Sequence, residues 1–171
     1  SDTAYNVLNR TEYPSIGFTF TLGATTLWEI FAEDPIDPRR GYSLNHPMQG
    51  GFDTWFYNGI AGINPDHENP GFKHIILKPR LTEKMEWASA SYNSIYGEIR
   101  SEWCNRTGNF RWRVLVPANT TATVYIPCSN PDMITEDSKP VSESDGVKFI
   151  CVKDGFAVYN LSSGDYDLKI G

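Results

Sequence analysis

The pattern of apolar positions along the chain changes near residue 70. Before this point, short apolar stretches are interrupted by glycine, proline and polar residues. After it, β-branched and aromatic residues recur in short runs that are separated by turn residues. Because helices and strands bury apolar residues with different periods, the change predicts two architectures. We expect a helical part over residues 1–70 and a strand-rich part over residues 71–171.

The first part contains three candidate helices. Ala4, Val7 and Leu8 are spaced to share one face, which predicts a helix over residues 3–10. Residues 17–22 are expected to be extended, residues 25–31 to form a second helix capped by Thr25 or Thr26, and residues 53–63 a third. The polar segment 33–42 is rich in proline and is expected to be a loop. The helix over 25–31 is apolar nearly all round, so a part of this size could hardly cover it alone.

Eight apolar runs in the second part are predicted to be strands. They span residues 75–78, 87–93, 98–104, 110–116, 121–126, 147–153, 156–161 and 166–170. Apolar residues at 110, 112, 114 and 116 alternate with Arg111 and Arg113, which indicates one buried and one wet face. Asp154-Gly155 is a two-residue hairpin signal, and residues 94–97 are expected to turn another pair. The spacing predicts an antiparallel β-sandwich, with residues 131–146 as a variable loop.

Composition and charge argue against some classes of binding partner. The 171 residues are 40% hydrophobic and 21% charged, which is typical of a globular protein with a core. A net charge of -6 argues against nucleic-acid binding, because such binding depends on clustered Lys and Arg. No apolar run approaches the length needed to cross a membrane. The five Trp and nine Tyr either fill the core or stack on sugar rings.

The cysteines do not suggest a metal site. Cys104, Cys128 and Cys151 lie far apart and form no CxxC pair, so we expect free, buried thiols. A disulfide between Cys128 and Cys151 stays open, because the sequence does not give the distance between their Cα atoms. No metal or cofactor motif is visible, and we expect the protein to need no cofactor.

Glu29 is the first candidate for chemistry. It follows Trp28 within the segment Gly23-Ala24-Thr25-Thr26-Leu27-Trp28-Glu29, in apolar surroundings. Burial of a carboxylate is unfavourable by several kcal/mol, roughly, unless a hydrogen bond or an opposite charge offsets it. From the residues alone, Glu29 is therefore either part of a structural pair or functional.

His46 is the second candidate. It lies in Ser43-Leu44-Asn45-His46-Pro47-Met48-Gln49-Gly50-Gly51, where Pro47 excludes a regular helix around it. A histidine fixed on a loop before a helix suits hydrogen bonding to a sugar hydroxyl, although it can equally be a satisfied structural residue. Asp53 is expected to cap the helix that follows.

Together these two segments resemble family 78 of the glycoside hydrolases, the bacterial α-L-rhamnosidases. The resemblance is carried by a Gly-Ala-Thr-Thr-x-x-Glu motif at residues 23–29 and a Ser-x-Asn-His-x-Met-x-Gly motif at residues 43–50. It continues through most of residues 13–127, including Trp55-Phe56-Tyr57, Pro70-Gly71-Phe72-Lys73, Tyr96-Gly97 and Pro117-Ala118-Asn119-Thr120-Thr121-Ala122. Residues 131–146 match nothing in the family pattern.

The resemblance implies an α+β fragment, in which the last helices of an (α/α)6 catalytic barrel (1–70) precede a C-terminal antiparallel β-sandwich (71–171). It implies inverting hydrolysis of a terminal α-L-rhamnosyl bond, with Glu29 as the general base. Trp28, Asn45 and His46 would bind the sugar. The general acid of the family lies upstream and is absent here. Three other carboxylates, Glu33, Asp34 and Asp37, match no family motif and are expected to be solvated.

Several further expectations follow from that resemblance. We expect the chain to be a segment of a longer protein and inactive alone, with a rhamnose-containing glycan or glycoside and the missing barrel as its partners. The truncation should expose apolar faces within residues 3–31 and 52–63. A periplasmic or secreted location is plausible for glycan degradation, and nucleic acid and membrane are not expected partners.

Two alternatives to a rhamnosidase segment stay open. The first is a non-catalytic carbohydrate-binding sandwich that uses exposed aromatics such as Trp87, Trp103 and Trp112. The second is a structural or protein-interaction domain. Binding of rhamnose by the sandwich would favour the first.

Overall fold

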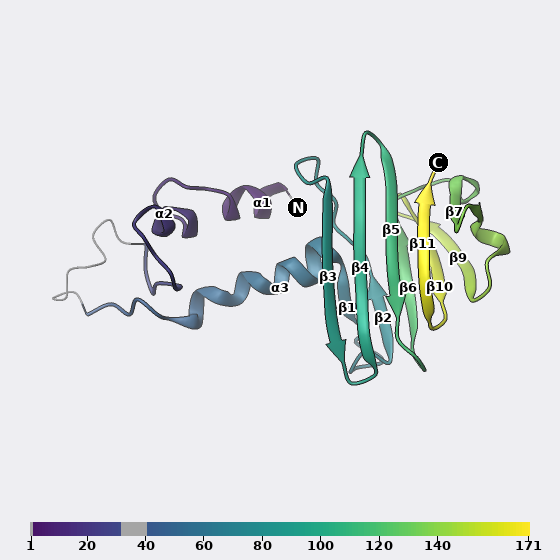
Figure 1. The fold of residues 1–171 in the computed structure, drawn as a ribbon, viewed down its shortest axis with the longest axis horizontal. Helices are drawn as coiled ribbons and strands as arrows, with labels where there is room; N and C mark the ends of the chain where they lie inside the picture. Colours follow the sequence, from purple (N-terminus) through teal and green to yellow (C-terminus); the bar gives the residue numbers. More distant parts are fainter. Residues whose placement is uncertain (1, 32–40) are drawn as a thin grey trace. The chain divides into compact units, whose positions relative to one another are not determined.

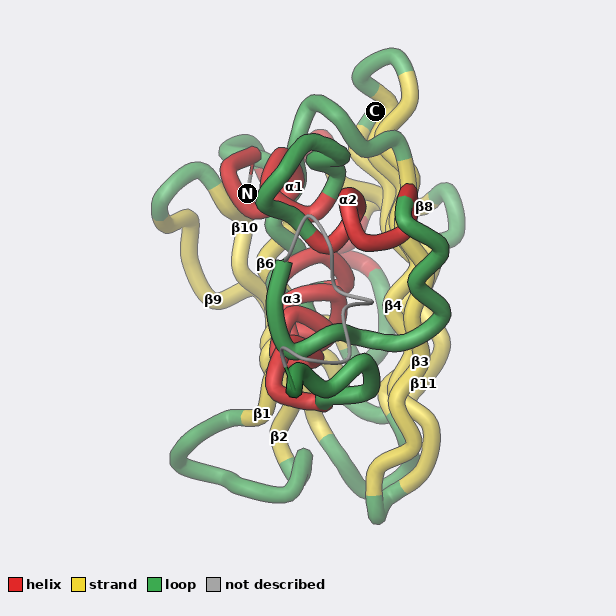
Figure 2. Tube along the Cα trace, turned by 90° about the vertical axis from the view of Figure 1, so that its left-hand side faces the viewer, coloured by secondary structure: helices red, strands yellow, loops and turns green. Residues whose placement is uncertain are grey.

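The computed structural model describes residues 2–31 and 41–171. The chain divides into two compact units, residues 1–55 and 56–171 (Figure 1). Among the described residues, the first unit carries helices and no strand, and all of the strands lie in the second unit (Figure 2). This order of elements confirms the expected α+β class.

The first unit begins with two short helices. Helix α1 (Asp2–Leu8) confirms the helix predicted over residues 3–10. Helix α2 (Ile16–Thr21) shows that the extended segment predicted over residues 17–22 was wrong. The hydroxyl of Ser15 accepts a hydrogen bond from the amide of Phe18 at 3.0 Å and caps α2. This cap outweighs the strand preference of the alternating Phe and Thr residues.

The helix predicted over residues 25–31 is also wrong. This segment is irregular, because its backbone is hydrogen-bonded to residues 43–46 instead of to itself. Thr26, expected as a helix cap, donates its hydroxyl to the carbonyl of Leu44. The loop predicted over residues 33–42 lies mostly outside the described residues.

The third predicted helix begins earlier than expected. A 3₁₀-helix, η2 (Pro47–Phe52), leads into α3 (Asp53–Trp55) and the π-helix η3 (Phe56–Ala61). His46 caps η2, so the expectation that Asp53 caps the helix was wrong; Asp53 lies where η2 meets α3. The helical run ends at Gly62, whose φ of 76° leads the chain into a strand.

All eight predicted strands are confirmed, with small changes at their ends. They are β2 (His74–Leu77), β3 (Trp87–Ser94), β4 (Gly97–Arg106), β5 (Asn109–Val116), β6 (Thr121–Ile126), β9 (Val147–Lys153), β10 (Phe156–Leu161) and β11 (Gly164–Ile170). Three short strands were not predicted: β1 (Ile63–Pro65), β7 (Ile134–Glu136) and β8 (Lys139–Pro140). The expected loop 131–146 also contains the 3₁₀-helices η4 (Pro131–Met133) and η5 (Val141–Glu143).

The strands form two sheets. One has the order β1-β2-β6-β10-β9 and the other β3-β4-β5-β11-β7-β8. Every pairing is antiparallel except that of β2 with β6. Asp154 and Gly155 both have positive φ in the β9–β10 turn, as the hairpin signal predicts. The pair Ser94–Gly97 closes the β3–β4 turn.

The face of β5 that was predicted to be buried does contribute to the core. Phe110, Trp112, Val114 and Val116 are buried, whereas Arg111 and Arg113 are exposed. The register sets Trp112 opposite Trp103 of β4 and Leu168 of β11, so large side chains from three strands meet in the interior. The three cysteines are free thiols as expected, but they are of intermediate burial and not buried.

A buried polar cluster fixes the end of η3 against β4 and β5. The indole of Trp103 donates to the carbonyl of Ile60 at 2.8 Å, and the hydroxyl of Ser101 donates to the carbonyl of Ala61 at 2.6 Å. The indole of Trp112 donates in turn to the Ser101 hydroxyl at 2.9 Å. The last carbonyls of a helix have no partner within the helix, and here strand side chains satisfy two of them. We call these five residues the helix-end cluster.

A charged pair ties β5 to β11 on the outer face of their sheet. The guanidinium of Arg111 binds both carboxylate oxygens of Asp167, with distances of 2.6 and 2.7 Å. This hydrogen bonding lowers the pKa of Asp167, and Lys169 at 3.2 Å adds to the effect against the opposing effect of burial. A depressed carboxyl pKa gives stability above the pKa of the unfolded chain, and this stability is lost as the pH falls through the folded pKa.

We therefore expect Asp167→Asn to lower the free energy of unfolding by about 1 kcal/mol at pH 7. The difference from the unaltered chain should shrink below about pH 4, where the carboxylate of the unfolded chain becomes protonated. Urea unfolding at several pH values measures both quantities. Asp165→Asn on the same strand removes an equal charge but leaves the Arg111 pair intact, and serves as the control. An equal loss in both variants would contradict the role of the pair.

Candidate functional site

The two motifs of the first unit lie side by side. The amide of Glu29 donates to the carbonyl of Ser43 at 2.9 Å, and the amide of His46 donates to the carbonyl of Leu27 at 2.8 Å. These bonds join residues 27–29 to residues 43–46. Residues 32–40, which the structure does not describe, lie between the two segments in the sequence. The structure therefore brings together the segments that hold Glu29 and His46.

The carboxylate of Glu29 is held through one of its oxygens. Oε2 accepts a hydrogen bond from the amide of Ser43 at 2.9 Å. Oε1 has no donor among residues 2–31 and 41–171. An amide donor fixes the direction of a carboxylate. Among the described residues, Oε1 is left for a further hydrogen bond, as a group that accepts a proton from water requires.

Gln49 supports the same residue from the second motif. Its side-chain amide donates to the backbone carbonyl of Glu29 at 3.3 Å. With the Ser43 amide on the carboxylate, Glu29 is held at its main chain and at its side chain by residues of one segment. Neither Ser43 nor Gln49 stood out as functional in the sequence, although both lie within the family motif at 43–50.

The imidazole of His46 has a defined proton position. Its Nδ1 caps η2 by accepting from the amide of Met48 at 3.3 Å. Because an amide N–H can only donate, Nδ1 is the acceptor and the neutral ring carries its proton on Nε2. The backbone at His46 is extended, with φ −125° and ψ 115°, in agreement with the expected loop. The ring thus has one N–H donor of the kind that binds a hydroxyl oxygen.

The other two expected sugar-binding residues differ in exposure. Trp28 is buried, with 6% of its surface exposed. Asn45 is exposed, and its backbone amide donates to the hydroxyl of Ser43 at 3.2 Å. Its side chain points to no partner that the described residues provide. The assignment of Glu29, His46, Trp28 and Asn45 to catalysis and sugar binding stays a prediction.

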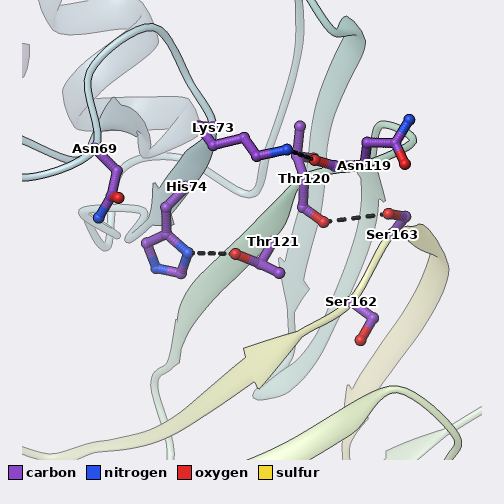
Figure 3. A pocket seen from close by; sticks show the side chains of 8 residues that line it. All are labelled: Asn69, Lys73, His74, Asn119, Thr120, Thr121, Ser162 and Ser163. Carbon is purple, nitrogen blue, oxygen red and sulfur yellow. Dashed lines mark hydrogen bonds between the residues drawn. The ribbon is translucent and has the colours of Figure 1, made fainter.

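The sandwich contains a polar cavity of about 490 Å³ at one end (Figure 3). Its polar groups are largely bonded to each other. Nδ1 of His74 lies 2.6 Å from the Thr121 hydroxyl, and Ser163 donates its hydroxyl to the carbonyl of Thr120 at 3.2 Å. Lys73 donates to the carbonyl of Asn119. These bonds join β2, β6 and the turn before β11, which is a structural role.

The tryptophans of the second unit also differ in exposure. Trp87 is 60% exposed, whereas Trp103 is 2% and Trp112 0% exposed. The expectation of exposed aromatics is therefore confirmed for Trp87 and wrong for the other two. Their indole N–H groups belong to the helix-end cluster, and a pattern of alternating residues does not reveal such a use.

Within the described residues, no three His, Cys, Asp or Glu side chains are placed to hold a metal ion. No described helix is long and apolar enough to span a membrane.

Comparison with known proteins defines the class and then the family. A model described as the bacterial α-L-rhamnosidase 6 hairpin glycosidase domain matches residues 1–60, which places the first unit in the class of glycosidases. The model of the bacterial α-L-rhamnosidase C-terminal domain matches residues 62–140. The chain belongs to the bacterial α-L-rhamnosidase family and corresponds to its C-terminal segment. The expected domain limits of 1–70 and 71–171 stay a prediction.

Several relatives are similar over most of the chain. An α-L-rhamnosidase of Streptomyces avermitilis is 34% identical over 99% of the chain, and one of Alteromonas sp. strain LOR is 33% identical over 86%. The chain spans 16% of the length of each. The crystal structure of the Streptomyces avermitilis enzyme complexed with L-rhamnose matches with a TM-score of 0.84 at 31% identity, over 99% of this chain and 16% of that one. The structure of the Dictyoglumus thermophilum α-L-rhamnosidase gives 0.83 at 31% identity, over 98% and 18%.

Proposed function

We propose that this chain is part of an α-L-rhamnosidase that hydrolyses terminal α-L-rhamnosyl bonds with inversion, and that Glu29 is its general base. The observation that carries the proposal is the state of the Glu29 carboxylate. One oxygen is fixed by the Ser43 amide, and the other has no donor in the described part of the chain. A water bound at the second oxygen would lose a proton to it as the water attacks the anomeric carbon.

His46 would bind the sugar through Nε2–H, because Nδ1 is already used by the amide of Met48. Asn45 offers an exposed amide from the same loop. Trp28 is buried, so its indole would line the wall of the sugar pocket or contact the sugar ring with one edge. The substrate would be a rhamnose-containing glycan or glycoside.

Inversion needs a second carboxyl group, which protonates the leaving oxygen from about 6.5 to 9.5 Å away. This group would come from the upstream barrel, outside these 171 residues. The chain alone would therefore lack activity. Exposed apolar side chains of the first unit, among them Val7, Phe20 and Met48, fit a missing neighbour of this kind.

The anomeric form of the released sugar tests the proposal. We expect a longer chain, with the remaining barrel, to release β-L-rhamnose first from an aryl α-L-rhamnoside, as followed by ¹H NMR before mutarotation. The 171-residue chain should release none. Release of α-L-rhamnose would contradict inversion, and hydrolysis by the 171-residue chain would contradict the need for an upstream acid.

Gln49 should act as a positioning residue for Glu29. We expect Gln49→Ala in the longer chain to lower kcat roughly 2–10-fold with little change in KM, since it removes one hydrogen bond of ~0.5–1.5 kcal/mol. The bond is made to the backbone of Glu29 and not to substrate. Steady-state kinetics on the aryl rhamnoside measure the effect, with Glu12→Gln, at an exposed carboxylate of the same unit, as the control. A rise in KM at unchanged kcat would assign Gln49 to sugar binding instead.

A further inference from the structure

Trp87 is unusual among the tryptophans of the sandwich. It opens β3, an edge strand of the six-stranded sheet, and its side chain is exposed while Trp103 and Trp112 are buried. Large apolar side chains that remain exposed beside a cavity are a feature of binding sites. Trp87 lines two neighbouring cavities, of about 330 and 630 Å³. Trp87 therefore contributes to the walls of both cavities.

The smaller cavity is lined by polar and charged side chains as well as by Trp87. Because side chains alternate along a strand, Trp87 and Ser89 of β3 share the outer face with Glu102 of β4 and Arg113 of β5. The cavity is lined by Trp87, Ala88, Ser89, Glu102, Trp103, Cys104, Arg111 and Arg113. One aromatic surface and several hydrogen-bonding groups thus meet across three strands.

Two of these groups face each other without forming an ion pair. The register places Glu102 directly opposite Arg113, yet no salt bridge joins them in the part of the chain that the structure describes. The neighbouring Arg111 is bound to Asp167 instead. The hydroxyl of Ser89 donates to Oε1 of Glu102 at 3.3 Å, which directs the carboxylate toward β3. Among the described residues, the Arg113 guanidinium and Oε2 of Glu102 are left to bind a ligand.

This set of groups fits a neutral pyranose. The C–H face of a sugar ring packs on an indole, and its vicinal hydroxyls donate to a carboxylate and accept from a guanidinium. The opposite charges of Glu102 and Arg113 cancel, so the site offers no net attraction to a charged ligand. A cavity of 330 Å³ can hold a monosaccharide unit.

We infer that the Trp87 surface, defined by Trp87, Ser89, Glu102 and Arg113, binds a neutral pyranose unit of the glycan, separately from the Glu29 site. The choice of a saccharide rests on the proposed function. The surface lies entirely in the second unit and contains no residue of the Glu29 site.

Tryptophan fluorescence and calorimetric titration of the 171-residue chain test this inference. With methyl α-L-rhamnoside, L-rhamnose, D-galactose and D-glucose as probes, we expect saturable binding of at least one, with a Kd on the order of 1 mM. Binding should change the tryptophan fluorescence, because the Trp87 indole is 60% exposed whereas Trp28, Trp103 and Trp112 are buried. Trp87→Ala should weaken binding at least about 10-fold, and Glu102→Gln about 3–10-fold.

Three controls make the outcome decisive. Ile95→Ala alters an exposed apolar residue in the β3–β4 turn, at the opposite end of β3 from Trp87, and should bind normally. Trp87→Tyr keeps an aromatic face and should bind within about 5-fold of the unaltered chain, which excludes a folding defect as the cause of the loss. Glu12→Gln alters an exposed carboxylate of the first unit and should bind normally.

Absence of saturable binding of all four sugars, or binding that Trp87→Ala leaves unchanged, would overturn the inference. Either result would leave the proposed hydrolysis untouched, because that proposal depends on Glu29. Conversely, binding that persists in a longer chain without hydrolytic activity would support the Trp87 surface and contradict the proposed function. Loss of binding on addition of the barrel would overturn the inference by showing that the surface is an internal contact.

Discussion

In the longer enzyme, Glu29→Gln is expected to reduce kcat on an aryl α-L-rhamnoside by roughly 10²–10⁴-fold, because a general base contributes about that much. The amide of glutamine keeps the size of the side chain and can still accept from the Ser43 amide through its oxygen. It cannot take a proton from water. KM should change little, since the base acts on water and not on the sugar.

A small anionic nucleophile separates loss of a base from loss of structure. We expect azide to restore turnover to Glu29→Ala, since azide needs no deprotonation, and the glycosyl azide should have inverted configuration. Glu12→Gln alters an exposed carboxylate of the same unit and should leave the rate unchanged. Near-normal turnover by Glu29→Gln would remove Glu29 as the base.

Gly62→Ala is expected to destabilise the sandwich by about 3 kcal/mol or more, as a buried steric conflict with backbone does. Gly62 has a φ of 76°, and a Cβ built there would lie 2.2 Å from the nitrogen of Pro79 and 2.4 Å from the carbonyl carbon of Lys78. The amide of Lys78 donates to the carbonyl of Gly62 at 2.9 Å, so the two segments cannot separate without loss of this bond.

Gly155→Ala gives the matched control for this prediction. Gly155 has a similar φ of 83° in the β9–β10 turn, but a Cβ there would meet no atom within 4 Å. Gly155→Ala should therefore lower the free energy of unfolding by only about 1 kcal/mol, from backbone strain. Urea unfolding measures the free energy of unfolding of both variants. Gly155→Ala reports the backbone strain alone, and Gly62→Ala reports the strain together with the steric conflict. Equal losses would contradict the close approach at Gly62.

The sequence was most informative where the alternation of side chains decides the structure. In β5, the alternation of large apolar residues with Arg111 and Arg113 predicted both the strand and its buried face, because a sheet has one inner side. The motif resemblance likewise predicted that Glu29 and His46 share a site, and the structure joins their segments. The roles of these residues in catalysis and binding stay predictions.

Other features depend on contacts that a local pattern does not contain. Residues 25–31 have an apolar composition that suggests a helix, but their hydrogen bonds go to residues 43–46, which no local rule anticipates. The α2 segment was decided by a single cap at Ser15. The holding of Glu29 by Ser43 uses a backbone amide, and so leaves no trace in the identity of the residue.

The helix-end cluster has a consequence for synthesis on the ribosome. The carbonyl of Ala61 is made 40 residues before Ser101, and that of Ile60 is made 43 residues before Trp103. At roughly 5–20 residues per second, both oxygens stay hydrated for about 2–9 s before their donors emerge. The final turn of η3 therefore acquires its permanent partners during translation of β4. The contact between η3 and the sandwich can therefore form only after the ribosome has synthesised β4.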